Sequence, residues 1–410
     1  MSKSLDQSKI SVFALARSRR ASRVCLRRIG GSLVAGAALA LAAMCPGSAS
    51  AEEFRVGFIM SLTGPSGELG KVTLEGAQAG IEMVNSTGGI GGAKATLVIC
   101  DVQSSEQQAV ICARKLALQD KVNLMVGTGS TPQTIAIIPT VEAAGVPFFA
   151  VASSPQAYAP VKKFVFKGIP GLTDQIPAIV EYFKAKKLLR VAVIHDNGPL
   201  GAAIGNIFKQ KIEGAGITVV DTLLYAPTDT DVSAQVTRMR AGKPDAVLNI
   251  AITPPAGALI VKTMQQLGMT VPIVVGSNLQ SKAFVDLVGD AVDKIVFPAA
   301  KVVLKDLPND DPLRSTIMTF RTNFAKVHAG KEPNSLSPWI VDPMLLAQKA
   351  AQPLGAKALD PKAFRDAIEA LHGVTGIQGI WSFSPTDHGP DLSNGMVLVK
   401  FKDNSWVPAQ

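Results

Sequence analysis

Small hydroxyl residues follow several expected strands of this 410-residue chain and stand just before expected helices. Backbone N–H groups at helix starts, together with hydroxyls, form sites suited to anions such as carboxylates. Single residues of this kind more often act as helix caps or turn residues. Three groups at one edge of a sheet favour a binding site for an anion. The groups are Ser66 after the first strand, Thr128, Ser130 and Thr131 after the third, and Ser153 and Ser154 after the fourth.

Motifs that would indicate catalysis do not fit this chain. The segment 64–72 departs from a phosphate-binding loop, because Pro65 replaces the first glycine and Val72 replaces the hydroxyl residue. No G-x-S-x-G motif occurs, and none of the four histidines has the spacing of a metal ligand. His195, at the end of an expected strand, is interpreted as structural rather than catalytic. We therefore expect a binding protein and not an enzyme, with no cofactor and no metal.

The elements that must position these residues alternate along the chain. Short apolar runs typical of buried strands are separated by amphipathic segments typical of helices. Strands are expected at 54–60, 95–100, 123–126, 146–151, 190–195, 218–225, 246–251 and 273–275, with short antiparallel strands in 379–407. This pattern predicts two α/β units, each with a parallel sheet between helices. Residues 168–173 and 297–301 are expected crossings between the units.

The first 51 residues have the pattern of an export signal. A basic segment through Arg28 precedes an apolar run at 29–44, and the small residues at 49–51 form a cleavage site. The alternative, a membrane anchor, is less favoured because the apolar run is short. The signal carries eight basic residues and one acid, so its removal lowers the net charge from +9 to +2. We expect a periplasmic protein cleaved near Ala51, and the charge gives no reason to expect a nucleic-acid partner.

Cysteine usage agrees with export. Cys25 and Cys45 lie in the signal, which leaves Cys100 and Cys112. An even number in an oxidising compartment favours one disulfide, and the alternative is two buried free thiols.

Several short segments, in this order and spacing, carry a family resemblance. They are Leu62-Thr63-Gly64-Pro65, the segments 76–81, 85–92 and 143–147, Ile194-His195-Asp196, and the segments 228–236 and 243–247. Over nearly all of 54–385 the chain resembles a periplasmic substrate-binding protein of the branched-chain amino acid (leucine/isoleucine/valine-binding) type, which serves ABC importers. The resemblance implies an α/β fold of two doubly wound parallel-sheet lobes with a cleft between them (type I periplasmic binding protein) and three crossover segments.

The resemblance also implies where the two lobes begin and end and which residues bind the ligand. Lobe 1 would comprise 52–170 plus 301–375, and lobe 2 would comprise 171–300 plus 376–410. The family holds an amino acid's carboxylate with first-lobe groups, which fall here on Ser130 or Thr131, the backbone of Ala152, and Ser154. Ser66 and Ser153 join them as neighbouring hydroxyls. Aromatic positions of the family pocket fall on Leu69, Leu200 and Ile252.

One position departs from the family pattern. The acid that would hold the ligand's ammonium falls on Asn278. An amide cannot neutralise an ammonium, and an unpaired buried charge costs several kcal/mol. A small hydrophobic or aromatic carboxylate therefore suits the pocket better than an α-amino acid.

The expected function is that of an extracytoplasmic solute receptor whose lobes close on the ligand. The resemblance implies a membrane permease and an ATPase as partners, and we expect a monomer. Two alternatives remain: a binding protein for branched-chain or other amino acids or amides, and a ligand sensor of the same fold. A secreted α/β enzyme is less favoured, because no acid–base pair is evident.

Overall fold

The structure, a computed structural model, describes residues 53–409, except for the side chains of Pro199 and Leu200. The expected export signal, with Cys25, Cys45 and the cleavage site at Ala51, lies outside the described residues.

The first sheet has five parallel strands in the order β2-β1-β3-β4-β5. They are β1 (Glu53–Met60), β2 (Lys94–Asp101), β3 (Leu124–Thr128), β4 (Phe148–Val151) and β5 (Val165–Lys167). Its helices are α1 (Gly67–Ser86), α2 (Glu106–Arg114), α3 (Thr131–Ala144), α10 (Val341–Ala351) and α11 (Pro361–Glu369). A two-stranded ribbon of β11 (Val374–Thr375) and β12 (Ile380–Trp381) follows α11.

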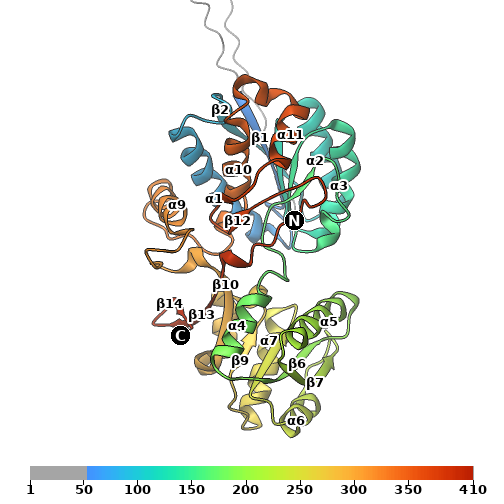
Figure 1. Cartoon of the computed structure of the whole chain (residues 1–410). Helices are drawn as coiled ribbons and strands as arrows, with labels where there is room; N and C mark the ends of the chain where they lie inside the picture. Colours follow the sequence, from blue (N-terminus) through green and yellow to red (C-terminus); the bar gives the residue numbers. More distant parts are fainter. Residues whose placement is uncertain (1–52, 410) are drawn as a thin grey trace, which may run out of the picture. The chain divides into compact units, whose positions relative to one another are not determined.

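Both faces of this sheet are covered because neighbouring strand residues point to opposite sides. Phe58 shares a buried cluster with residues of α1, α10 and α11, whereas Ile59 shares one with residues of α2 and α3. Figure 1 shows these helices on the two sides of the sheet. We refer to this unit as the first lobe.

The second sheet, that of the second lobe, has seven strands in the order β14-β13-β10-β9-β8-β6-β7. They are β6 (Arg190–Asp196), β7 (Thr218–Tyr225), β8 (Ala246–Ile250), β9 (Ile273–Val275), β10 (Ile295–Ala300), β13 (Met396–Lys402) and β14 (Ser405–Pro408). The strands β6 to β10 are parallel, and the C-terminal pair is antiparallel. Its helices are α4 (Ile176–Ala185), α5 (Pro199–Gly214), α6 (Ser233–Ala241), α7 (Pro254–Gln266) and α8 (Lys282–Val288), and a further helix, α9 (Arg314–Val327), follows β10 along the chain.

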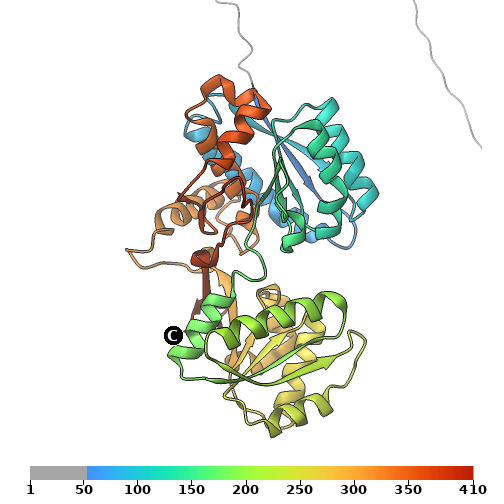
Figure 2. The same ribbon diagram turned by 45° about the vertical axis from the view of Figure 1, so that its right-hand side comes forward.

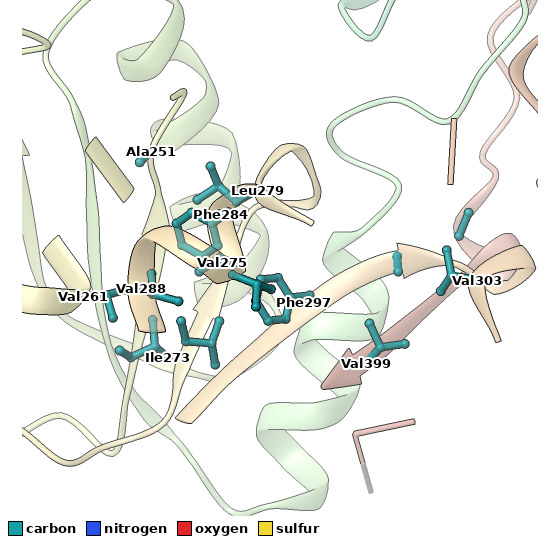
Figure 3. Close-up of a cluster of buried hydrophobic side chains, with 14 of the residues drawn as sticks. Ala251, Val261, Ile273, Val275, Leu279, Phe284, Val288, Phe297, Val303 and Val399 are labelled. Carbon is teal, nitrogen blue, oxygen red and sulfur yellow. The ribbon is translucent and has the colours of Figure 1, made fainter. Parts of the chain in front are cut away.

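The second sheet is likewise packed on both sides (Figure 2). Helices α4 and α5 cover one face, and α6, α7 and α8 cover the other. Figure 3 shows part of the latter core, where Ile273 and Val275 of β9 lie near Phe284 of α8 and Phe297 of β10. Helix α9 instead packs beside α1 of the first lobe (Figure 1), and its Ile317 and Phe320 share a buried cluster with Ala79 of α1.

The segment 297–301, which we expected to be a crossing, is mostly strand. Residues 297–300 are the last four residues of β10 and pair with β13. The partner strand comes from the end of the chain, and local sequence does not reveal such a pairing.

The last crossing lies later than the expected boundary at residue 376. Trp381, Phe383 and Leu392 pack in the core of the first lobe, and the chain joins the second sheet only at Met396. We therefore propose that the first lobe extends to Leu392.

The outer edge of β5 is covered by a segment from late in the chain. The Lys167 amide donates to the His388 carbonyl at 2.8 Å, and His388 Nδ1 lies 2.9 Å from the Val165 carbonyl oxygen. The His388 ring stacks on Phe166 with centroids 4.1 Å apart. The last strand of the first sheet is thus paired on both sides.

Candidate ligand pocket between the two sheets

A cavity of about 570 Å³ takes its walls from both lobes and from the first crossing. The first lobe contributes Gly129, Thr131, Val151, Ala152 and Ser153, and the crossing contributes residues 169–172. The second lobe contributes Ser277, Asn278, residues 280–282 and 298–300, Met396 and Trp406. Asn334, Ser335, Leu336, Trp339 and Gln378 complete the wall.

The first-lobe wall forms at the carboxyl ends of β3 and β4. These strands are parallel neighbours, so the residues that follow them lie at the same edge of the sheet. Thr131 opens α3, and Ala152 and Ser153 directly follow β4. Thr128 is fully buried, and its hydroxyl lies 3.0 Å from the Ser130 carbonyl and 2.7 Å from Thr134 Oγ1. Thr128 therefore holds the turn, while Thr131 and Ser153 face the cavity.

Three other expected hydroxyls do not line this cavity. Ser130 lies instead in a separate polar hollow beside Ser104 and Ser105. Ser66 precedes α1, and its amide donates to Ser104 Oγ at 3.0 Å. The carbonyl of Ser154 accepts from the Ala157 amide at 3.1 Å, in a short turn after β4.

The expected apolar positions are dispersed as well. Leu69 lies directly behind the wall, since a β-carbon on Gly129 would come within 3.3 Å of its Cδ2. Ile252 is exposed and does not line the cavity. Leu200 lies in the first turn of α5, but its side chain lies outside the described residues.

Asn278 lines the pocket, but its amide nitrogen already serves the backbone. Nδ2 donates to the carbonyls of Ala251 at 2.9 Å and Ile252 at 3.0 Å. The side chain thus joins the turn after β9 to the loop after β8.

Sequence reasoning missed the two tryptophans of the pocket. Trp339 lies in a turn before α10, and Trp406 lies on β14, where its ring packs against Phe297 with centroids 5.1 Å apart. It also missed Lys282, the first residue of α8. These residues lie far from the hydroxyl groups in sequence. Trp406 comes to the cavity only because β14 pairs with β13, which in turn pairs with β10.

A buried carboxylate supports the pocket wall at Gln378. Asp342 of α10 accepts hydrogen bonds from the amides of Ile377 at 2.6 Å and Gln378 at 2.8 Å, and from Trp381 Nε1 at 3.1 Å. Burial raises the pKa of Asp342 to about 6, although these hydrogen bonds oppose the shift. The carboxylate therefore fixes the turn that brings Gln378 to the cavity.

A larger cavity, of about 720 Å³, lies beside the first crossing. Its wall includes Tyr158, the buried pair of Lys167 and Asp174, and Lys211 near the end of α5. The carboxyl ends of the second sheet's strands do not reach it, because Lys211 lies toward the opposite end of that sheet. We therefore assign the ligand site to the smaller cavity.

The described residues offer neither a metal site nor a helix that could span a membrane. Within residues 53–409, no group of three or more His, Cys, Asp or Glu side chains could hold a metal ion. In the same part of the chain, no helix is both long and apolar enough to cross a bilayer.

Cys100 at the end of β2 and Cys112 of α2 are joined by a disulfide, with Cα atoms 5.7 Å apart. The bond ties a helix of the first lobe to its sheet, and neither cysteine lines the pocket.

Known proteins resemble this chain along most of its length. A family model described as periplasmic binding protein matches residues 53–405. The chain is 27% identical to Leu/Ile/Val-binding protein homolog 3 of Brucella melitensis, over 65% of this chain and 73% of that protein. An extracellular ligand-binding receptor from Rhodopseudomonas palustris HaA2 matches with a TM-score of 0.71 and 24% identity, over 87% of this chain and 99% of that one. An ABC transporter substrate-binding protein from Sphaerobacter thermophilus matches with a TM-score of 0.73 and 20% identity, over 88% and 97%.

Proposed function

The chain belongs to the periplasmic binding protein family, and from that premise we propose that it is the extracytoplasmic solute receptor of an ABC importer. Its ligand is a small hydrophobic or aromatic carboxylate, and binding closes the two lobes. The relatives whose names mention leucine, isoleucine and valine make a branched-chain amino acid the second candidate.

The observation that carries the proposal is the makeup of the pocket wall. No acidic side chain from residues 53–409 lines the cavity. The α-ammonium of an amino acid would therefore be buried without a counter-charge, which costs several kcal/mol. Apolar and aromatic side chains, among them Leu336, Trp339 and Trp406, supply the surface for a hydrophobic body.

The carboxylate is held by the first lobe in this proposal. Thr131 and Ser153 offer hydroxyls, and the backbone amide of Ala152, directly after β4, offers a further donor. Hydrogen bonds to a charged group each contribute about 1.5–3 kcal/mol. A carboxylate needs several such donors once the lobes exclude water.

Ser153→Ala should weaken binding about tenfold to a hundredfold, because it removes one charge-assisted hydrogen bond. Ser154→Ala is the matched control: it removes the same hydroxyl one residue further on, where the side chain does not line the cavity, and should leave the Kd within about twofold. Isothermal titration calorimetry on the chain from residue 52 measures both variants.

The same titration decides between the two candidate ligands. Leucine is compared with 4-methylpentanoate, which has the same side chain without the amine, and with benzoate. The proposal requires that an acid without the amine binds more tightly than leucine. If leucine binds best, the chain is an amino-acid receptor.

Export and partners belong to the same proposal. The protein would be cleaved near Ala51, work as a periplasmic monomer, and deliver its ligand to a membrane permease and its ATPase. Mass spectrometry of the periplasmic fraction tests the first point, with a mature chain that begins near Glu52 as the expected result.

A further inference from the structure

The pocket has a single charged side chain on its wall among the described residues, and that residue is Lys282. It comes from the second lobe, whereas the neutral donors at Thr131, Ala152 and Ser153 come from the first. A ligand that bridges the lobes therefore meets hydroxyls and amides on one side and a cation on the other.

Lys282 is free to exchange its present partner. It forms an ion pair with Asp286, one helical turn further along α8. Both side chains are mostly exposed, at 59% and 61%, so water screens the pair and its contribution to stability is small. An anionic group of a ligand enclosed by the lobes would be a stronger partner, because charge-assisted hydrogen bonds gain strength away from water.

Besides Lys282 and neutral polar groups, the wall of the pocket carries apolar side chains. Leu336, Trp339 and Trp406 line the cavity together with Ile169 of the first crossing. With a volume of about 570 Å³, the cavity lies well within the range of sites for ligands larger than a single amino acid. A ligand with an apolar middle and an acid at each end would match all three regions.

We propose that the ligand is a diacid with an apolar body, and that Lys282 is the specificity-determining residue that pairs with its second anionic group. The inference rests on the proposed function, because the first carboxylate is the one assigned to the first lobe. A positive charge at this place also repels the ammonium of an amino acid.

The test compares acids that differ only in the second carboxylate. Terephthalate is titrated beside benzoate, and suberate beside octanoate, by calorimetry on the chain from residue 52. The diacid of at least one pair should bind about tenfold more tightly than its monoacid. Raising the salt concentration should weaken the diacid more than the monoacid, because an ion pair is screened.

Three variants separate Lys282 from general effects of charge. Lys282→Gln should weaken the diacid at least about tenfold and leave the monoacid within about twofold, whereas Lys282→Arg should keep the preference. Lys262→Gln is the matched control, since Lys262 is an exposed lysine of α7 that does not line the cavity.

Each outcome has one meaning. If monoacids bind but diacids have no advantage, or if Lys282→Gln weakens both acids equally, this inference is overturned and the proposed function stands. If leucine binds more tightly than every acid, the proposed function fails and the inference fails with it. Thermal melting of the unliganded variants checks the fold, which an exposed side chain should not affect.

Discussion

Asp342 shows how one residue supports a site that it does not touch. Its carboxylate accepts from two amides and an indole N–H, and these donors define the turn at 376–379. Burial removes water from the Asp342 carboxylate and makes it harder to ionise. The pKa of Asp342 therefore rises to about 6 from a usual 3.8. The native state therefore binds more protons than the unfolded chain between about pH 4 and 6, and the contribution of Asp342 to stability falls as pH rises through that window.

We predict that Asp342→Asn destabilises the protein at every pH, because its amide nitrogen would face donors. The loss should be larger at pH 4 than at pH 7 by up to about 3 kcal/mol, since only the native carboxyl titrates in between. Denaturant unfolding at the two pH values measures the difference. Asp286→Asn, at an exposed position, is the control. An equal loss at both pH values would refute the assigned pKa.

At the scale of elements, the first crossing is held by a buried ion pair at its ends. Lys167 ends β5, and its ammonium donates to Asp174 Oδ2 at 2.7 Å and to the Pro390 carbonyl at 2.6 Å. The same Asp174 oxygen accepts from the Gly171 amide at 2.8 Å. The side chains are only 2% and 6% exposed. Because residues 169–172 line the ligand pocket, this pair positions part of its wall.

Lys167→Met should cost about 3–5 kcal/mol of unfolding free energy, because it leaves the Asp174 charge buried without a partner. Lys362→Met is the matched control: Lys362 pairs with Asp366 on the surface, with exposures of 77% and 50%, and its loss should cost less than about 1 kcal/mol. Chemical denaturation of both variants decides the matter. Similar losses would mean that the buried pair contributes no more than the exposed one.

For the whole molecule, the expected two-lobed α/β fold is confirmed, and family membership confirms a binding protein rather than an enzyme. Apolar runs between amphipathic segments were enough to place most strands, because that alternation is a local property. The pocket was less predictable. Thr131, Ala152, Ser153 and Asn278 do line the cavity, and Ser130 shows that a strand-end hydroxyl can face elsewhere. Trp406 reaches the cavity only through strand pairing at the end of the chain, whereas Lys282, four residues after Asn278, could have been found from its place at the start of the helix after β9.

The two-lobed design leads to a prediction about the molecule as a unit. An acid that contacts both lobes should reduce the radius of gyration in small-angle X-ray scattering, as expected for lobe closure. At a free concentration of 100 times its Kd, it should also add about 2.7 kcal/mol to the unfolding free energy. Two of the three tryptophans line the pocket, so intrinsic fluorescence reports the same event. Stabilisation without any change in size would argue against closure.

The cover over the edge of β5 has a consequence for the order of folding. The strand is complete at Lys167, but its hydrogen-bond partner, His388, is synthesised more than two hundred residues later. Until then the first sheet presents an open edge, which is the kind of surface that recruits strands from other chains. A fragment that stops short of residue 388 would keep that edge open. The protection of the β5 edge against aggregation thus depends on a segment near the opposite end of the sequence.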